Sequence, residues 1–253
     1  MSSWASFFVA LLALVQVWAI GLWRRFFRRG ALDIFETGRI EVGYSTLGPT
    51  LGLHGTLRAV NRDQFVQAVG LVVTRERDGA RHEFPWDVFR GGQKGSEGFA
   101  VELPAGFLVS TVLPYRYNIL FSDTETRRDI ENLLAPVREA WVAKLAAAPP
   151  VDDDARLGLF TEYQAEPTHF TTHAELVHAL YWNPGWYTLE MSVQTSRPAV
   201  QHSRKWRFEL SVENVSLLKL NAISSLAFAC GFNDANFNFA YPPYESSEPQ
   251  PAR

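Results

Sequence analysis

The chain has 253 residues, of which 47% are hydrophobic and 20% are charged, so its composition is that of a folded protein with a sizeable core. Its formal net charge is −3, although four arginines are concentrated within residues 24–29. The remainder of the chain is therefore more acidic than the total suggests. A surface of that sign does not attract phosphate backbones, so we expect no nucleic-acid partner.

Cysteine use excludes several kinds of site. Cys230 is the only cysteine, so an intramolecular disulfide cannot form and a cysteine-based zinc site has too few ligands. Its neighbours from Leu226 to Ala229 are mostly apolar, which predicts a buried and unreactive thiol.

The N-terminal region contains an uncharged apolar segment. It runs from Trp4 to Trp23, and its twenty residues would span roughly 30 Å as a helix, the thickness of a bilayer's hydrocarbon core. Trp4, Trp18 and Trp23 lie toward the ends, where indole rings favour the membrane interface. Gln16 is the strongly polar residue within the segment. Its amide either bonds to a neighbouring helix or is simply tolerated, and the sequence does not decide between the two.

The flanking charges predict how this segment is oriented. Arg24, Arg25, Arg28 and Arg29 follow it directly, and the positive-inside rule places such a cluster in the cytoplasm. A cleaved signal peptide is the alternative, but it normally has a basic start and a shorter apolar stretch. We therefore expect residues 1–30 to be a single-pass transmembrane anchor with its N-terminus outside and membrane lipid as a partner.

The next region predicts antiparallel strands. Apolar and polar residues alternate over 40–44 and again over 50–60. Two further strands at 65–74 and 82–88 flank Asp78-Gly79, a strong hairpin signal. Pro85 lacks an N–H, so the second of these strands should lie at a sheet edge.

Further along, strands are expected at 99–103, 107–113 and 115–121, after a glycine-rich loop at 91–98. Ser122 and Glu125 have the spacing of a capping box before a helix at 124–147. The acidic run at 152–154 reads as a loop.

The last third predicts a mixture of helices and strands. A helix should begin at Thr172 and stop before Asn183-Pro184-Gly185. A second hairpin is expected from strands at 187–193 and 206–212, joined by 196–204. A helix at 217–230 that ends at Gly231 and a short strand at 237–241 complete the chain.

Eight or nine strands that follow one another without a regular βαβ rhythm predict a mainly β, α+β fold. We expect an antiparallel β-sandwich of immunoglobulin-like type with inserted helices, which forms one domain at 31–244. Residues 245–253 should be a disordered polar tail.

Few residues suggest chemistry. His169 and His173 are four apart and His178 is near them, yet the glutamate of a metalloprotease helix is missing. Three adjacent aspartates at 152–154 do not have calcium-loop spacing. Nucleophile-elbow, P-loop and dinucleotide motifs do not occur, so we expect no catalytic residues, metal or cofactor.

Binding remains as the favoured function. Two groups of aromatic residues could form interfaces, although core packing explains them equally well: Trp182, Trp186 and Tyr187, and Phe237, Phe239 and Tyr241. We expect a membrane-anchored accessory or scaffold protein that presents an interaction domain to a protein partner, or to another copy, at the cytoplasmic surface. The alternatives are a membrane-tethered hydrolase using His169 and His173, and a ligand-sensing effector.

Overall fold

The computed structural model describes residues 15–16, 18–21, 30–95, 98–196, 199–233 and 235–246. Gln16 and Trp18 are helical and exposed. Trp4, Trp23 and the four arginines at 24–29 lie outside the described residues. Within the described ranges, no helix is both long enough and apolar enough to cross a membrane.

The fold is mainly β with helices, as predicted, and its sheet is antiparallel. The described strands form one eleven-stranded sheet with the main order β10-β1-β2-β7-β4-β3-β8-β9-β11, while β5 pairs with β4 and β6 with β3. The strands are β1 (Ala31–Ser45), β2 (Gly48–Val60), β3 (Gln64–Arg75), β4 (Arg81–Gly95), β5 (Gly98–Glu102), β6 (Phe107–Val109), β7 (Tyr115–Ser122), β8 (Gly185–Ser196), β9 (Ala199–Leu210), β10 (Phe239–Ala240) and β11 (Tyr244–Ser246).

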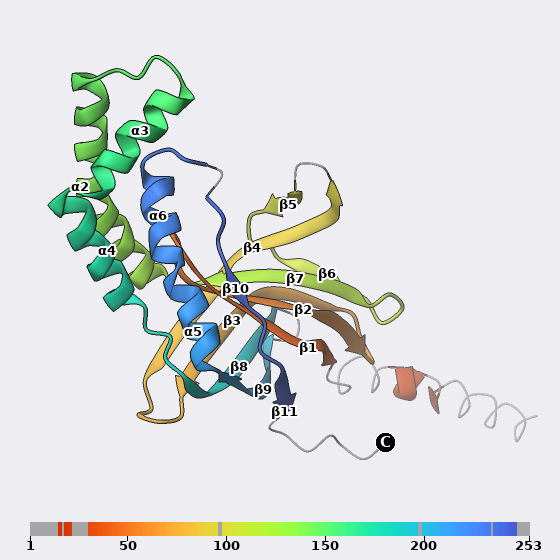
Figure 1. Ribbon diagram of the computed structural model, residues 1–253. Coiled ribbons are helices and arrows are strands. Elements are labelled where there is room, and N and C mark those ends of the chain that lie inside the picture. Colours follow the sequence, from red (N-terminus) through yellow and green to blue (C-terminus); the bar gives the residue numbers. More distant parts are fainter. Residues whose placement is uncertain are drawn as a thin grey trace, which may run out of the picture.

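A single curved sheet replaces the two packed sheets of the expected sandwich (Figure 1). The difference arises at β4, which pairs with β3 on one side and with β7 on the other. It thereby joins the two blocks of strands into a half-barrel. Alternation of apolar residues shows which face of a strand is buried, but it does not show which strand lies next to it.

The C-terminal segment links the two edges of the half-barrel. Its β10 pairs with β1 through Val42↔Ala240, and its β11 pairs with β9 through Tyr244↔Phe208. Residues 245 and 246 therefore belong to a strand, where the sequence predicted the start of a disordered tail. Close to this seam, the indole N–H of Trp206 donates to Glu36 Oε1 at 2.9 Å.

The helices gather at one end of the sheet, on the left of Figure 1. They are α2 (Thr124–Ala147), α3 (Asp153–Gln164), α4 (Pro167–Ala179), α5 (Val212–Lys219) and α6 (Asn221–Ala229). The predicted helix at 124–147 is confirmed, whereas the helix expected over 217–230 is divided into α5 and α6.

Local signals explain where several helices begin. The N-cap of α2 is Asp123 rather than Ser122, and its carboxylate accepts the N–H groups of Glu125 and Thr126. Asp152 caps α3 in the same way, so residues 153 and 154 lie in a helix and not in the predicted loop. Acidic residues favour these positions because the helix N-terminus is partially positive. Helix α4 begins at Pro167, five residues before the predicted start at Thr172.

Both hairpins are confirmed. The turn of the first contains Gly79 at φ +70°, a left-handed conformation that glycine adopts without strain. The second is longer than predicted, because β8 and β9 remain paired as far as Ser196↔Ala199 where a long connection was expected.

The core fills the inside of the half-barrel and continues under the helices. Its largest fully buried side chains include Trp182, Trp206, Tyr44, Tyr163 and Tyr187. Tyr44 joins the two regions, because its hydroxyl donates to the Leu176 carbonyl of α4 at 2.8 Å. Cys230 is buried, as predicted, and burial raises its thiol pKa to about 12.

Candidate functional site

Part of β4 has a free side. Residues Arg81–Pro85 pair with β3, while pairing with β7 begins at Trp86. The expectation from Pro85 that this strand lies at an edge therefore holds for its first half and is wrong for its second half. The Ala80 carbonyl accepts the Arg75 N–H at 2.9 Å. Because hydrogen-bonded pairs alternate along an antiparallel ladder, the backbone groups of Arg81 and Glu83 should point away from β3.

A cleft of about 640 Å³ lies along this free edge. One wall is formed by residues of β3 and β4, with Ser192 of β8, and the other by Asp123 and the first turn of α2. The side chains of Glu83, Asp123 and Glu125 bring carboxylates to the cleft, while Arg81 and His82 are its basic groups. Hereafter this region is called the β4 cleft.

Asp123 and His82 face each other across the β4 cleft. His82 Nδ1 lies 3.6 Å from Asp123 Oδ2, slightly beyond hydrogen-bond distance. The Asp123 carboxylate is nearly buried and accepts three hydrogen bonds, from the backbone of Glu125 and from the backbone and hydroxyl of Thr126. It is therefore held rigidly, whereas the His82 side chain is 32% exposed and accessible from the cleft.

Tyr181 supports the histidine from the core side. Its ring stacks on the His82 imidazole with centroids 3.8 Å apart and an interplanar angle of 5°. The Tyr181 hydroxyl is buried and has no hydrogen-bond partner among the described residues. Burial raises its pKa well above the usual value, and the nearby Asp123 charge raises it further. The ring is therefore a neutral, apolar support for His82.

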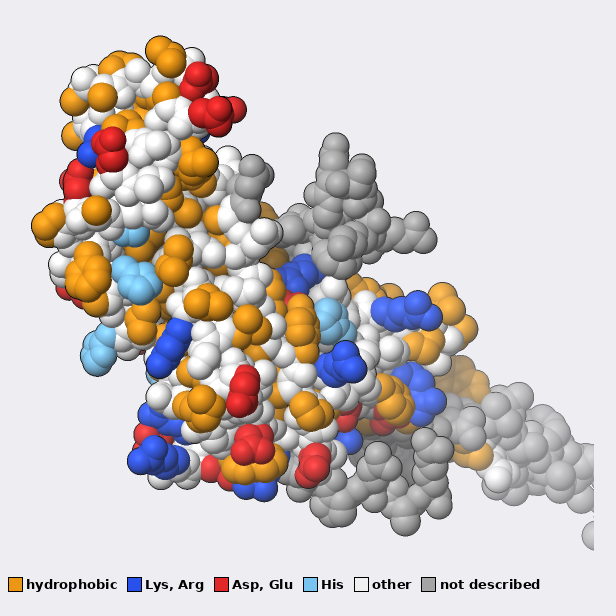
Figure 2. Space-filling model, in the orientation of Figure 1, with side chains coloured by type: hydrophobic (Ala, Val, Ile, Leu, Met, Phe, Trp, Pro, Cys, Tyr) orange, Lys and Arg blue, Asp and Glu red, His pale blue; other side chains and the backbone are white. Residues whose placement is uncertain are grey.

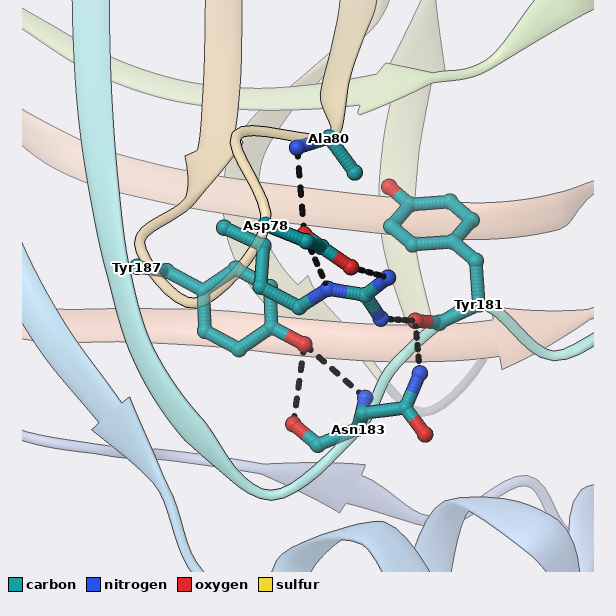
Figure 3. A network of polar contacts seen from close by, with 6 residues as sticks. Asp78, Ala80, Tyr181, Asn183 and Tyr187 are labelled. Carbon is teal, nitrogen blue, oxygen red and sulfur yellow. Dashed lines mark hydrogen bonds and ion pairs between the residues drawn. The ribbon is translucent and has the colours of Figure 1, made fainter.

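A polar network fixes the position of Tyr181 (Figure 3). The guanidinium of Arg75 pairs with Asp78 in the hairpin turn and donates to the Tyr181 carbonyl at 3.2 Å. The Asn183 side-chain amide donates to the same carbonyl at 2.9 Å. The Tyr187 hydroxyl accepts from the Asn183 N–H and donates to its carbonyl, both at 2.8 Å. The network thus ties the β3–β4 turn to the segment that precedes β8.

A second set of contacts supports the α2 side of the β4 cleft. Asp87 occupies the irregularity in β4 between Trp86 and Val88. Its carboxylate accepts the Ser122 hydroxyl at 3.0 Å and lies 3.9 Å from Arg127 of α2. The irregularity thereby connects β4 to the start of α2, and these contacts hold the two walls of the cleft in position relative to each other.

The serine hydroxyls near the β4 cleft are engaged in hydrogen bonds. The Ser122 hydroxyl donates to Asp87, and the Ser192 hydroxyl donates to the Gly70 carbonyl at 3.4 Å. Asp123 serves as a helix cap. What the β4 cleft offers is a backbone edge, carboxylates and an accessible imidazole.

The histidines singled out from the sequence do not converge. His169 is only 6% exposed and packs edge-on against Phe160 and Tyr163, while His178 is exposed at the end of α4. Burial lowers the His169 pKa, as does the nearby His173. Among the residues that the structure describes, no three histidine, cysteine or acidic side chains are grouped to hold a metal ion. The hydrolase hypothesis therefore has no assembled centre in these residues.

The first group of candidate interface residues is divided between core and surface. Trp182 and Tyr187 are buried, and the indole N–H of Trp182 donates to the Gly43 carbonyl at 3.1 Å. Core packing explains both. Trp186 is 37% exposed, and the Arg207 guanidinium lies 4.1 Å from its ring centroid. It remains available as a surface residue.

The second group lies on the C-terminal segment. Phe237 and Phe239 are half-buried, and the Phe237 ring contacts that of Phe228 in α6. Tyr241 is 52% exposed. This group does not adjoin the β4 cleft in the described contacts, so the sequence identified different residues from those that line it.

His82 and Asp123 were missed as a pair because they are 41 positions apart in the sequence. Two available signals point to their meeting place. Pro85 indicated an unpaired side of β4, and the capping pattern placed the start of a helix directly after a strand. Combining them requires the pairing of β4 with β7, which alternation does not provide.

No protein-family model matches this chain, and a comparison with the curated proteins found no match.

Proposed function

We propose that this protein is a membrane-anchored accessory protein whose half-barrel binds an extended segment of a partner protein along the free edge of β4, at the cytoplasmic membrane surface. The observation that carries this proposal is the unpaired side of Arg81–Pro85 facing an open cleft. An exposed strand edge is a ready template for strand addition, in which main-chain hydrogen bonds supply affinity and flanking pockets supply specificity.

Charge indicates which partner segment fits. The carboxylates of Asp123 and Glu125 face the β4 cleft, while Arg81 and Glu83 are paired with each other at 3.1 Å. A bound strand that carries lysine or arginine complements this wall, and electrostatic complementarity favours encounter and correct register. The His82 imidazole, exposed on its cleft side, can add a hydrogen bond to such a segment.

The membrane part of the proposal depends on the sequence at residues 4–29. An uncharged apolar segment of bilayer length is followed by four arginines, which favours an anchor with the following domain in the cytoplasm. Membrane lipid is then the first partner and the edge-binding protein the second. Gln16 could add a contact between anchors.

Site-specific crosslinking tests the binding function. A photoreactive residue at position 83 should give a discrete adduct in native membranes, while the same residue at Glu139, exposed on α2, should not. An adduct of twice the chain mass would identify a second copy as the partner. Equal adducts at both positions would contradict the proposal.

A matched pair of substitutions tests the role of the backbone. With the photoreactive residue moved to position 125, Glu83→Pro removes an N–H on the free side of β4, where proline is sterically tolerated, and should abolish the adduct. Glu83→Ala retains that N–H and should preserve most of it. Equal adducts in the two variants would rule out strand addition at this edge.

A further inference from the structure

A group of exposed apolar side chains lies at the end of the half-barrel opposite the helices. Its members are Phe65, Leu108, Val112 and Leu113, which are 42%, 58%, 82% and 72% exposed. We call these four residues the apolar rim. Large hydrophobic side chains this exposed and this close together mark a contact surface more often than chance exposure.

Backbone pairing brings the rim together. Phe65 in β3 lies opposite Leu108 in β6, and the Thr111 N–H and hydroxyl both bond to Asp63 Oδ1, at 2.7 and 3.0 Å. These bonds hold the turn that contains Val112 and Leu113 against the start of β3. The same bonds lower the pKa of the Asp63 carboxyl, so this exposed side chain stays ionised beside the rim.

The N-terminal segment enters the domain at the same end. Gly30 lies against the Gln64 side chain and the Arg62 carbonyl, and Ala31 pairs with Val60 at the end of β2. Figure 1 shows the start of β1, the end of β2 and the β6–β7 turn at this one end. In Figure 2, hydrophobic and basic side chains gather at the same right-hand end of the molecule.

Chain length limits how far this end can lie from the apolar segment. Residues 24–29 connect Trp23 to Gly30, and seven fully extended residues reach at most about 25 Å. If the segment is held in a bilayer, the rim must lie close to the bilayer surface. Arg62 and Arg116 are exposed near the rim, where they complement anionic lipid headgroups.

We infer that the apolar rim inserts into the lipid headgroup interface and orients the domain, so that the β4 cleft faces away from the membrane. This inference rests on the membrane anchor of the proposed function. Phe65 and Gly70, the nearest cleft residue on β3, are five residues apart, which separates the rim from the cleft by about 17 Å. A bilayer explains the rim better than a second copy because apolar tips beside arginines match the layered chemistry of a headgroup interface.

Lipid-depth quenching tests this inference on the full chain in vesicles that contain anionic lipid. A fluorescent label at Val112→Cys, in a Cys230→Ala background, should be strongly quenched by lipids brominated near the headgroup. The same label at Glu139→Cys on α2 should not be quenched. The double variant Leu113→Asp with Leu108→Asp should reduce quenching at position 112 without changing flotation, because both side chains are exposed and the anchor is intact.

Flotation with the vesicles separates the two claims. A protein that floats but shows equal quenching at positions 112 and 139 retains its anchor and overturns the rim inference alone. A protein that does not float contradicts the anchor of the proposed function, and with it the rim. Protection of position 112 by dimerisation, without lipid quenching, would likewise overturn the inference.

Discussion

The imidazole of His82 lies flat on the ring of Tyr181, with 3.8 Å between centroids, and its Nδ1 faces the Asp123 carboxylate at 3.6 Å. Three elements meet in this contact: β4, the segment before β8 and the first turn of α2. The stack therefore fixes the geometry of the β4 cleft from the core side, and the residues around it give the most direct tests of the fold.

Removing the Tyr181 hydroxyl should stabilise the protein. That hydroxyl is buried without a partner, and an unsatisfied buried group costs about 1 kcal/mol or more, so Tyr181→Phe should raise the free energy of unfolding by about 1 kcal/mol. Tyr44→Phe is the matched control, because the Tyr44 hydroxyl donates to Leu176 and its loss should lower stability by about 1 kcal/mol. Chemical denaturation measures both, and effects of the same sign would contradict the two assignments.

Two glycines should respond oppositely to alanine. Gly79 has φ +70° in the first hairpin turn, so Gly79→Ala should destabilise the protein by about 1 kcal/mol. Gly158 lies exposed in α3 with open space around it, so Gly158→Ala should stabilise the protein by up to about 1 kcal/mol. Thermal unfolding measures the order of stability of the two variants and the parent. A Gly79→Ala variant as stable as the parent would exclude the described turn.

Asn221 should be essential to the C-terminal seam. Its buried amide donates to the Tyr44 and Asn238 carbonyls at 2.7 and 2.8 Å and accepts the Asn238 N–H at 2.8 Å. Asn221→Ala leaves these backbone groups of Tyr44 and Asn238 unpaired and should lower the free energy of unfolding by about 2–4 kcal/mol. Ser224→Ala removes a single hydrogen bond, from the exposed Ser224 hydroxyl to the Asn236 carbonyl. It should lower the free energy of unfolding by roughly 1 kcal/mol or less. Faster hydrogen exchange at residues 239–246 in the Asn221 variant alone would locate the effect.

Acidification should destabilise the fold from near-neutral pH. Burial lowers the pKa values of His54, His169 and His202. At His54 the Glu41 charge opposes this shift and Arg90 adds to it, while at His169 the nearby His173 adds to it. A histidine whose folded pKa is depressed resists protonation, so its contribution to stability is complete above the unfolded pKa of about 6.5 and is lost as pH falls below it. Melting temperatures measured between pH 7.5 and 5 should therefore decrease.

One substitution identifies a source of this pH dependence. His169→Leu keeps an apolar side chain between Phe160 and Tyr163 and removes the titrating group, so its melting temperature should fall less steeply with acid. An unchanged slope in this variant would assign the effect to other groups.

The sequence predicted the strands well because each buries one face. Ile40, Val42 and Tyr44 alternate with less apolar neighbours, and all three are buried in β1. Helix α2 was equally clear from its apolar spacing and its capping residues. These signals are local, so they survive in any tertiary arrangement.

The closure of the sheet could not be predicted in this way. It depends on β4 pairing with both β3 and β7, and on Tyr244 reaching β9 from the far end of the chain. The β3–β4 hairpin is local and was predicted, but the pairings of β4 with β7 and of β11 with β9 are long-range, and a period-2 pattern leaves the neighbour of each strand unspecified. The candidate cleft follows from the same pairing, which is why His82 was interpreted only as a strand residue.

The aromatic interface residues illustrate a second limit. Trp182 and Tyr187 lie on either side of a turn-like sequence, Asn183-Pro184-Gly185, that is typical of an exposed loop. In the structure both rings are instead buried inside the half-barrel, and the ring centroids of Trp182 and Phe84 are 6.2 Å apart. Large apolar rings are buried wherever a cavity of matching size exists, and only the tertiary structure shows that cavity.

Sidedness of the membrane tests the central claim most directly. Single cysteines at Ser3 and Glu139, in a Cys230→Ala background, can be labelled with a membrane-impermeant maleimide in right-side-out vesicles. We predict that Ser3→Cys reacts at once and that Glu139→Cys reacts only after the vesicles are opened. Labelling of Glu139→Cys in intact vesicles, or recovery of the protein in the supernatant after the vesicles are sedimented, would contradict an anchored protein with a cytoplasmic domain.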